Sequence, residues 1–460
     1  MAILIQQLPP PRLHISAQAV TERITKAAVF LYFLGVVLPS ELAVSPFGLA
    51  LIPVRLVLLA FFFPALALLA RSRDFRLQAF DAMLVLALAW LLIALVVNNG
   101  FEKGFKYGGS LVLEALGGYL LARAYVRNYT QFADAVRCYF LFVLVAAAVA
   151  FPEAFLKIKF VHALASQLTG NPDIAVTSEA GRLGLERATS TFDHPILYGV
   201  FCATSLGLVW YMHKGGSSLW IKAGVIAFAT LCSVSSAPLL AYAMVVAFIA
   251  WELLTRQMPH RAAATIAAAA FVYLVLEVFS NRSAVEVIIS FIALDSWTAY
   301  YRVLIWQNAY VDLVNHPLLG VALNAWTRPK WMTGSVDAFW LVTALTGGLP
   351  TTLLLGAAVI TLLRKVHART GARETRERWQ ARFGWTAAVL ALSFQAFTVH
   401  YWGSMHSLFF FILGMGAWMT DSRYGLVSEP GKATLVAAPP RTLVSGRPGP
   451  APRGRRAAPR

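Results

Sequence analysis

Two arginines, Arg187 and Arg302, lie in polar segments that interrupt a very apolar chain. Each segment also contains a histidine followed by a proline, at His194 in the first and at His316 in the second. A guanidinium group held in place by ordered backbone can bind a phosphate through two parallel hydrogen bonds. The simpler interpretations are a helix cap for His194 and, for Arg302, an interfacial cation whose aliphatic stem lies on apolar surface. The two segments are therefore candidates for an anion-binding site.

A carboxylate, Asp337, lies in a third polar segment, just before a long apolar run. In that position it could act as a general base or orient an arginine, and it could equally cap the helix that follows. His194 and His316 are the other candidates for a proton acceptor. The sequence leaves the choice among these three groups open.

Three further residues join the candidate substrate-binding set. Tyr198 and Trp306 lie in the same segments as the two arginines. Arg55 lies inside an apolar run, where an ionisable residue is by default a functional candidate, and we expect it to line a path for lipid or phosphate. Glu114 and Glu277 fall in or near other apolar runs and carry less weight.

A group of aromatic and histidine residues near the C-terminal end of the apolar region, His400, Tyr401, Trp402 and His406, is typical of the aromatic belt at a membrane surface. The histidines of the chain are widely separated and lack the spacing of a ligand set, so we expect no metal site. No other cofactor is expected.

The composition defines the class of protein. Of 460 residues, 58% are hydrophobic and 13% are charged, with a mean hydropathy of +0.64. Soluble domains carry about 25% charged residues, so a soluble fold is excluded, and the same numbers exclude disordered and disulfide-rich secreted chains. The three cysteines form no C-x-x-C pair. The chain is therefore predicted to be a polytopic membrane protein.

Twelve apolar runs approach the length of about 20 residues that a helix needs to cross the hydrocarbon core. We therefore expect an all-α membrane helix bundle with about twelve spans. The runs cover residues 25–39, 47–70, 79–97, 106–122, 136–155, 195–212, 219–235, 237–254, 262–279, 337–363, 382–399 and 403–420.

The positions of the basic residues along the chain show what the net charge of +17 means. With the N-terminus placed in the cytoplasm, 28 of the 39 Lys and Arg residues fall on the cytoplasmic side, ten fall outside, and Arg55 lies within a run. Such an asymmetry is the signature of membrane orientation. Both termini are therefore predicted to be cytoplasmic, and the charge indicates topology rather than a nucleic-acid partner.

Two outward connections, 157–194 and 281–336, are long, and long loops inside a compact domain are usually functional. The second has apolar residues at helical spacing, which predicts an amphipathic helix with Trp306 and Tyr310 on its apolar face, lying on or packed into the outer face of the membrane. The predicted organisation is thus a cytoplasmic segment 1–24, a membrane domain 25–420 and a disordered basic cytoplasmic tail 421–460.

The order of these motifs resembles the O-antigen ligase and O-antigen polymerase superfamily of bacterial polysaccharide assembly. The resemblance depends on the segment from Arg187 to Gly199 and, above all, on the two segments that follow it. These contain R-x-x-x-W from Arg302 with His316-Pro-Leu-Leu-Gly320, and Asp337-x-x-x-Leu with Gly347-Gly348-Leu349. It covers residues 180–420, and the hydropathy pattern extends it over the membrane region.

The resemblance implies a GT-C type, inverting glycosyltransferase of the bacterial inner membrane with its active site on the periplasmic face. Its donor would be a glycan on undecaprenyl diphosphate, without a metal or a nucleotide sugar. Arg187 and Arg302 would bind the diphosphate leaving group and stabilise its developing charge. Chain-length regulator and flippase proteins are the partners that this function suggests.

Asp337 occupies the position where ligases of the superfamily carry a histidine. This departure favours a polymerase that joins oligosaccharide repeats into O-antigen, capsule or exopolysaccharide. The alternatives are an O-antigen ligase that transfers the glycan to lipid A core and, from another class, a transporter of lipid-linked glycans. A transporter is expected to place its charges near the midplane of the membrane, on broken helices.

Overall fold

The structure is a computed structural model of the whole chain. It describes residues 17–73, 75–174, 181, 184–258, 260–281, 287, 296–324, 326–368, 373–421 and 426–427. Parts of the predicted terminal segments 1–24 and 421–460, and parts of both long connections, lie outside the described residues.

The described chain is helical except for one pair of two-residue strands, which confirms the all-α class. The helices are α1 (Ala17–Val37), α2 (Pro53–Arg71), α3 (Ala79–Asn99), α4 (Phe101–Tyr125), α5 (Tyr129–Leu156), α6 (Phe160–Thr169), α7 (Pro195–Met212), α8 (Leu219–Cys232), α9 (Ser236–Thr255), α10 (Arg261–Phe279), α12 (Ser296–Asn315), α13 (Phe339–His367), α14 (Arg376–Gln395) and α15 (Gly403–Met415). Short 3-10 turns are η1 (Ser40–Leu42), η2 (Pro46–Gly48) and η4 (Ala417–Thr420), and β1 (Arg373–Glu374) pairs antiparallel with β2 (Leu426–Val427).

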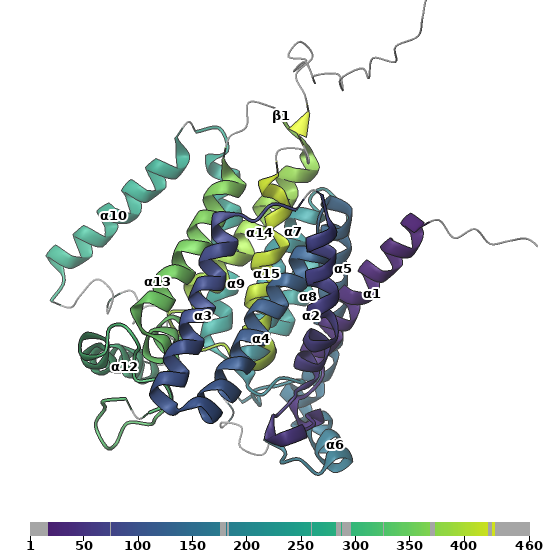
Figure 1. Cartoon of the computed structure of the whole chain (residues 1–460). Helices are drawn as coiled ribbons and strands as arrows, with labels where there is room; N and C mark the ends of the chain where they lie inside the picture. Colours follow the sequence, from purple (N-terminus) through teal and green to yellow (C-terminus); the bar gives the residue numbers. More distant parts are fainter. Residues whose placement is uncertain are drawn as a thin grey trace, which may run out of the picture.

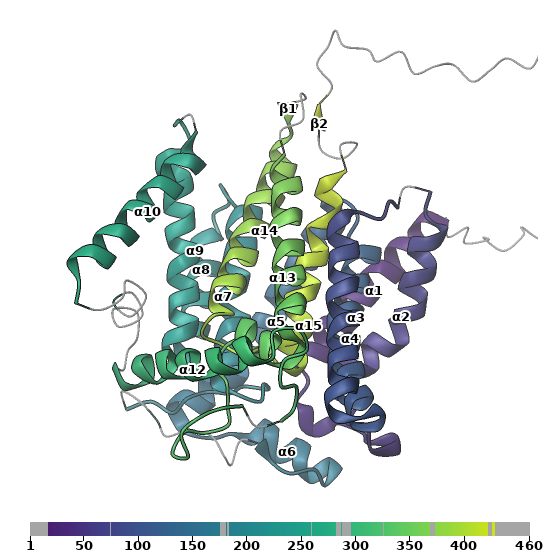
Figure 2. The same cartoon turned by 60° about the vertical axis from the view of Figure 1, so that its left-hand side comes forward.

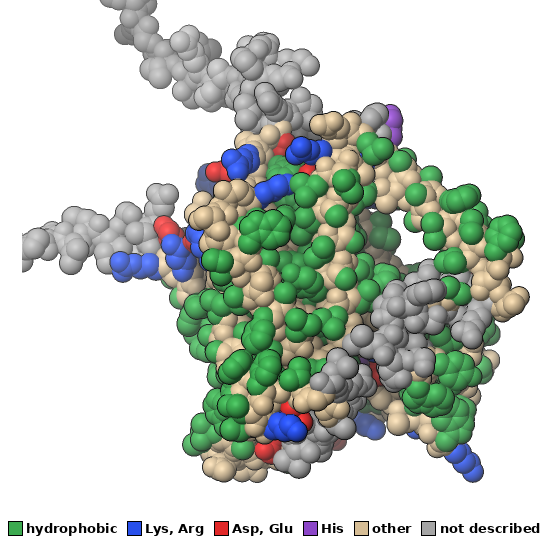
Figure 3. Space-filling model, turned by 180° about the vertical axis from the view of Figure 1, so that it is seen from behind, with side chains coloured by type: hydrophobic (Ala, Val, Ile, Leu, Met, Phe, Trp, Pro, Cys, Tyr) green, Lys and Arg blue, Asp and Glu red, His purple; other side chains and the backbone are tan. Residues whose placement is uncertain are grey.

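A helix covers each of the twelve apolar runs. Within the described residues, six helices are long and apolar enough to cross a membrane, namely α2, α3, α5, α7, α9 and α13. The face drawn in Figure 3 shows a broad hydrophobic band with most of the visible Lys, Arg, Asp and Glu side chains toward its ends. The helices and the surface therefore have the features of a membrane protein. The number of twelve membrane spans stays a prediction.

Helix α7 forms the centre of the bundle and packs against α5, α8, α9 and α14. Small residues allow it to approach α14 closely, since a Cβ added at Gly207 would lie 2.6 Å from the Cβ of Ala387. Around this centre, α3 packs against α13 and α4 packs against α15. The apolar helix α10 instead runs apart from the bundle and is exposed along most of its length (Figure 1).

Both long connections reach the same end of the bundle. Figures 1 and 2 show α6 and α12 at this end and the β1–β2 pair at the opposite end. This agrees with the prediction that the two connections lie on one side of the membrane. We call this end the outer end below, and its assignment to the periplasm stays a prediction.

The predicted amphipathic helix is present as α12, and part of the apolar face that the sequence assigns to it is not covered by protein. Ile305, Ala309 and Asp312 face the protein, whereas Tyr310 and Val314 are 66% and 56% exposed. Apolar spacing defines a face but does not tell whether protein or membrane covers it.

The loop after α12 is interlocked with a kink in α13. Gly348 adopts φ +73° inside α13, and a Cβ there would lie 2.0 Å from the carbonyl oxygen of Leu318. Gly320 makes the reciprocal approach, since its Cβ would lie 2.2 Å from the carbonyl oxygen of Leu345. The amide of Leu349 then donates a 2.8 Å hydrogen bond to the Pro317 carbonyl. The two glycine motifs thus hold α12 against α13 by direct backbone contact.

We predict that Gly348→Ala destabilises the protein by about 2 kcal/mol or more. The backbone of Gly348, at φ +73° and ψ 175°, lies in a region that is essentially restricted to glycine and costs about 1–3 kcal/mol for another residue. The added Cβ would also displace the loop. The matched control is Gly356→Ala in the same helix, where a Cβ would meet no atom within 4 Å and should stabilise by up to about 1 kcal/mol. Thermal unfolding in detergent, followed by tryptophan fluorescence, measures both. Equal melting temperatures for the two variants would contradict the interlock.

Candidate functional site

Arg187 lies in a rigid loop that is anchored to two helices. The buried carboxylate of Glu153 in α5 accepts hydrogen bonds from the amides of Thr189, at 2.8 Å, and Ser190, at 2.7 Å. The amide of Ala188 donates to the Cys232 carbonyl at the end of α8. Arg187 is only 1% exposed, and burial lowers the pKa of its guanidinium group. The loop therefore holds the cation in one place without help from a ligand.

His194 caps α7, as the sequence suggested. Its Nδ1 accepts a 3.1 Å hydrogen bond from the amide of Ile196, and Pro195 occupies the first helical position. Because Nδ1 is the acceptor, the neutral ring carries its proton on Nε2. Burial and the charge of Arg187 lower the pKa of His194 to about 4, and Asp337 partly opposes this shift. Arg187 and Asp337 therefore each lie within electrostatic range of His194.

Asp337 does not cap α13. The N-cap is Ala338, and the first amides of α13 donate instead to carbonyl oxygens at the end of α14: Phe339 to Val399, at 3.0 Å, and Trp340 to Ala396, at 3.1 Å. The carboxylate of Asp337 is exposed and accepts a hydrogen bond from its neighbour Ser335. It is therefore available at the outer end for a role other than capping.

Arg302 lies on α12, which packs beside Asp337. Ile305, one turn beyond the half-buried Arg302, shares a hydrophobic cluster with Val336 and Ala338, the residues that flank Asp337. The helix therefore brings Arg302 to the same end of the bundle as Arg187.

The remaining predicted site residues occupy other positions. Trp306 supports α12, because its indole donates a 3.3 Å hydrogen bond to the Phe397 carbonyl. Tyr198 is fully buried inside α7. His316 is exposed beyond the end of α12, and its position 14 residues after Arg302 corresponds to about 21 Å along a helix. His316 therefore lies far along α12 from Arg302, although the two residues belong to the same predicted segment.

Arg55 belongs to a buried ionic network that the sequence did not predict as a group. Its guanidinium lies 2.8 Å from Oε1 of Glu114, which is fully buried, and Oε2 of Glu114 lies 2.9 Å from Nδ1 of His406. His406 is 5% exposed and Tyr401 is 1% exposed, so neither is an aromatic-belt residue as expected. The rule that flags ionisable residues in apolar runs found Arg55 and Glu114 singly, but their pairing depends on how α2, α4 and α15 pack.

A small cavity of about 30 Å³ lies beside this network. His400, His406, Thr343 and Thr346 are among its lining residues, and it has room for one or two water molecules. Burial and the nearby His406 lower the pKa of His400 to about 4. The centre of the Trp402 ring lies 5.7 Å from that of the His400 ring and 6.0 Å from that of the His194 ring, so Trp402 packs against both histidines.

No protein-family model matches this chain, and no curated protein shows a significant match to it. Within the described residues, no three His, Cys, Asp or Glu side chains come together in a way that could hold a metal ion. Glu277 lies exposed on α10, away from the network.

Stability should depend on pH through His194. Its pKa is about 4 in the fold and about 6.5 in the unfolded chain, so the unfolded state binds more protons between these values. Stability is therefore expected to fall by up to about 3 kcal/mol as the pH is lowered from 6.5 to 4. His194→Asn keeps a capping oxygen but cannot titrate, so its melting temperature should fall less over this range. Identical pH slopes for the two proteins would contradict the assignment.

Breaking the buried network should be costly. Glu114→Gln leaves Arg55 and His406 facing a neutral amide, and loss of one partner from a buried ion pair typically costs about 3–5 kcal/mol. The matched control is Glu102→Gln, which removes the carboxylate of an exposed pair with Lys106 and should leave the melting temperature nearly unchanged. If both variants melt alike in detergent, the network does not hold the helices together.

Proposed function

We propose that this chain is a GT-C type membrane glycosyltransferase that polymerises oligosaccharide repeats carried on undecaprenyl diphosphate. The observation that carries the proposal is that Arg187 and Asp337, 150 residues apart in the sequence, both act on the charge of His194. The connection between α14 and α15 supports this placement, because it accepts a hydrogen bond from the amide of Phe339 and sets the centre of its Trp402 ring 6.0 Å from that of the His194 ring. A buried cation and an exposed carboxylate on either side of one histidine suit a reaction that releases an anion and removes a hydroxyl proton. The proposed location is the bacterial inner membrane, with the outer end in the periplasm.

The two arginines would bind the lipid diphosphate as its bond to the sugar breaks. Charge builds up on the leaving oxygen at that point, and bidentate guanidinium groups can stabilise it in a site that excludes water. Arg187 needs little reorganisation because the loop already fixes it. Arg302 would approach from α12 on the other side of the substrate.

Asp337 is the better candidate for the proton acceptor. The Nδ1 of His194 is committed to the α7 cap, and a neutral His194 could accept a proton there only by giving up that hydrogen bond. The exposed carboxylate of Asp337 has no such duty. It would take the proton from the acceptor hydroxyl as that oxygen bonds to the anomeric carbon, which inverts in a single displacement.

A second candidate function follows from the Arg55–Glu114–His406 network. Charged residues inside a helix bundle are typical of transporters, which move an intact substrate past such groups. A transporter of lipid-linked glycans would leave the diphosphate–sugar bond unbroken. A ligase would break the same bond but transfer the glycan to lipid A core.

The direct test supplies purified protein in nanodiscs with a lipid-linked repeat unit and measures undecaprenyl diphosphate and polymer. We expect the wild type to release the lipid diphosphate and Arg302→Ala to be slower by about 10²–10³-fold, since it loses one stabiliser of the developing charge. Lys330→Ala, which removes an exposed cation from the same connection, should retain full activity. Intact lipid after long incubation with the wild type, or an unaffected Arg302→Ala, would overturn the proposal.

A further inference from the structure

A groove between α1 and α5 lies at the end of the bundle opposite α6. Both helices run toward α6: α1 leads into η1, which packs against α6, and α5 directly precedes it. Their first turns therefore lie at the other end, which the charge distribution predicts to be cytoplasmic. The groove has a volume of about 580 Å³, within the range of pockets that hold small molecules.

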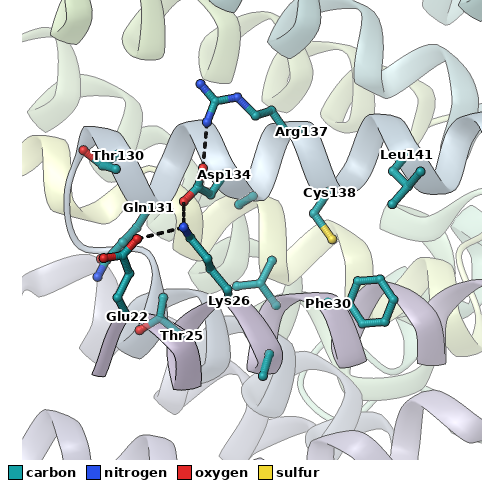
Figure 4. A pocket seen from close by; sticks show the side chains of 13 residues that line it. Glu22, Thr25, Lys26, Phe30, Thr130, Gln131, Asp134, Arg137, Cys138 and Leu141 are labelled. Carbon is teal, nitrogen blue, oxygen red and sulfur yellow. Dashed lines mark hydrogen bonds and ion pairs between the residues drawn. The ribbon is translucent and has the colours of Figure 1, made fainter. Parts of the chain in front are cut away.

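The mouth of the groove carries four charges in alternating order. Lys26 lies 2.7 Å from Glu22 and 3.5 Å from Asp134, and Asp134 in turn lies 2.7 Å from Arg137 (Figure 4). The row therefore runs from acid to base to acid to base across the two helices. Its formal charge is zero.

The floor of the groove is apolar and runs deeper along both helices. Val29 and Phe30 follow the charged turn of α1, and Cys138 and Leu141 follow that of α5. Figure 4 shows Phe30, Cys138 and Leu141 on the side away from Glu22 and Thr130. Phe30 and Leu141 are 44% and 47% exposed, so the floor opens to the surface that lipid would cover. The groove thus changes from charged to apolar in the direction of the membrane interior.

We propose that this α1–α5 groove binds a phospholipid whose zwitterionic headgroup carries a primary ammonium, as in phosphatidylethanolamine. The gradient from charged mouth to apolar floor matches a lipid with its headgroup at the surface and its acyl chains inward. Lys26 and Arg137 would bind the phosphate, and Glu22 and Asp134 would accept hydrogen bonds from the ammonium group.

The alternating charges select among headgroups. A purely anionic headgroup would be repelled by the two carboxylates as much as it is attracted by the two cations, so the row adds little to its binding free energy. A quaternary ammonium, as in phosphatidylcholine, has no N–H to donate to the carboxylates. The inference is independent of the proposed glycosyl transfer, because the groove lies at the other end of the protein.

The test titrates the full chain in detergent with dioleoyl phosphatidylethanolamine, phosphatidylcholine or phosphatidylglycerol and counts bound lipid by native mass spectrometry. We expect the ethanolamine lipid to bind on the order of tenfold more tightly than the other two, since hydrogen bonds between charged partners are lost in each alternative. Equal affinities, or a preference for phosphatidylglycerol by the wild type, would overturn the proposal.

Two variants separate the mouth from the floor. Asp134→Asn gives the row a formal charge of +1 and should shift the preference toward phosphatidylglycerol. Cys138→Phe leaves all four charges in place but narrows the floor, and should weaken binding of every lipid. Glu102→Gln, in an exposed ion pair at the outer end, should bind lipids like the wild type. Melting temperatures measured without lipid show whether each variant is folded. If Asp134→Asn and Cys138→Phe bind the three lipids as Glu102→Gln does, the proposed site is contradicted.

Discussion

The outer end of this protein depends on the backbone contact between Gly348 and the loop after α12. Two glycines let the loop carbonyl of Leu318 and the helix carbonyl of Leu345 lie where a Cβ would otherwise stand. Side chains of α3 complete the contact, since Trp90 donates to the Leu318 carbonyl and Asn98 to the Leu319 carbonyl. This contact fixes α12, and hence Arg302, relative to α13 and the aspartate that precedes it.

A second set of contacts passes through the connection between α14 and α15. Its carbonyl oxygens accept the first amides of α13 and the indole of Trp306, and its own Trp402 donates to Asp193 at 3.1 Å. Asp193 in turn accepts from Ser40, which precedes α2. The connection therefore joins α12, α13 and the Arg187 loop. A site assembled from distant segments needs such a shared support, because each segment alone could move independently.

Part of this arrangement could be predicted from the sequence. Hydropathy located a helix in every apolar run, and the helix cap, one of the interpretations that the sequence left open for His194, is present in the structure. The local sequence was insufficient where a residue from a distant segment determines the hydrogen bonds or burial of a side chain. Asp337 was a reasonable cap, but the carbonyls of Ala396 and Val399, just after α14, accept the first amides of α13 instead. His406 reads as a surface aromatic-belt residue until the packing of α15 against α4 places it on Glu114.

The central claim is that Arg187 and Arg302 bind one lipid diphosphate at the outer end of the bundle. A structure of the protein in nanodiscs with a non-hydrolysable undecaprenyl diphosphate analogue tests it most directly. The account predicts diphosphate oxygens within hydrogen-bonding distance of both guanidinium groups, with Asp337 facing the sugar. A diphosphate bound elsewhere, or two guanidinium groups that face separate spaces, would contradict it.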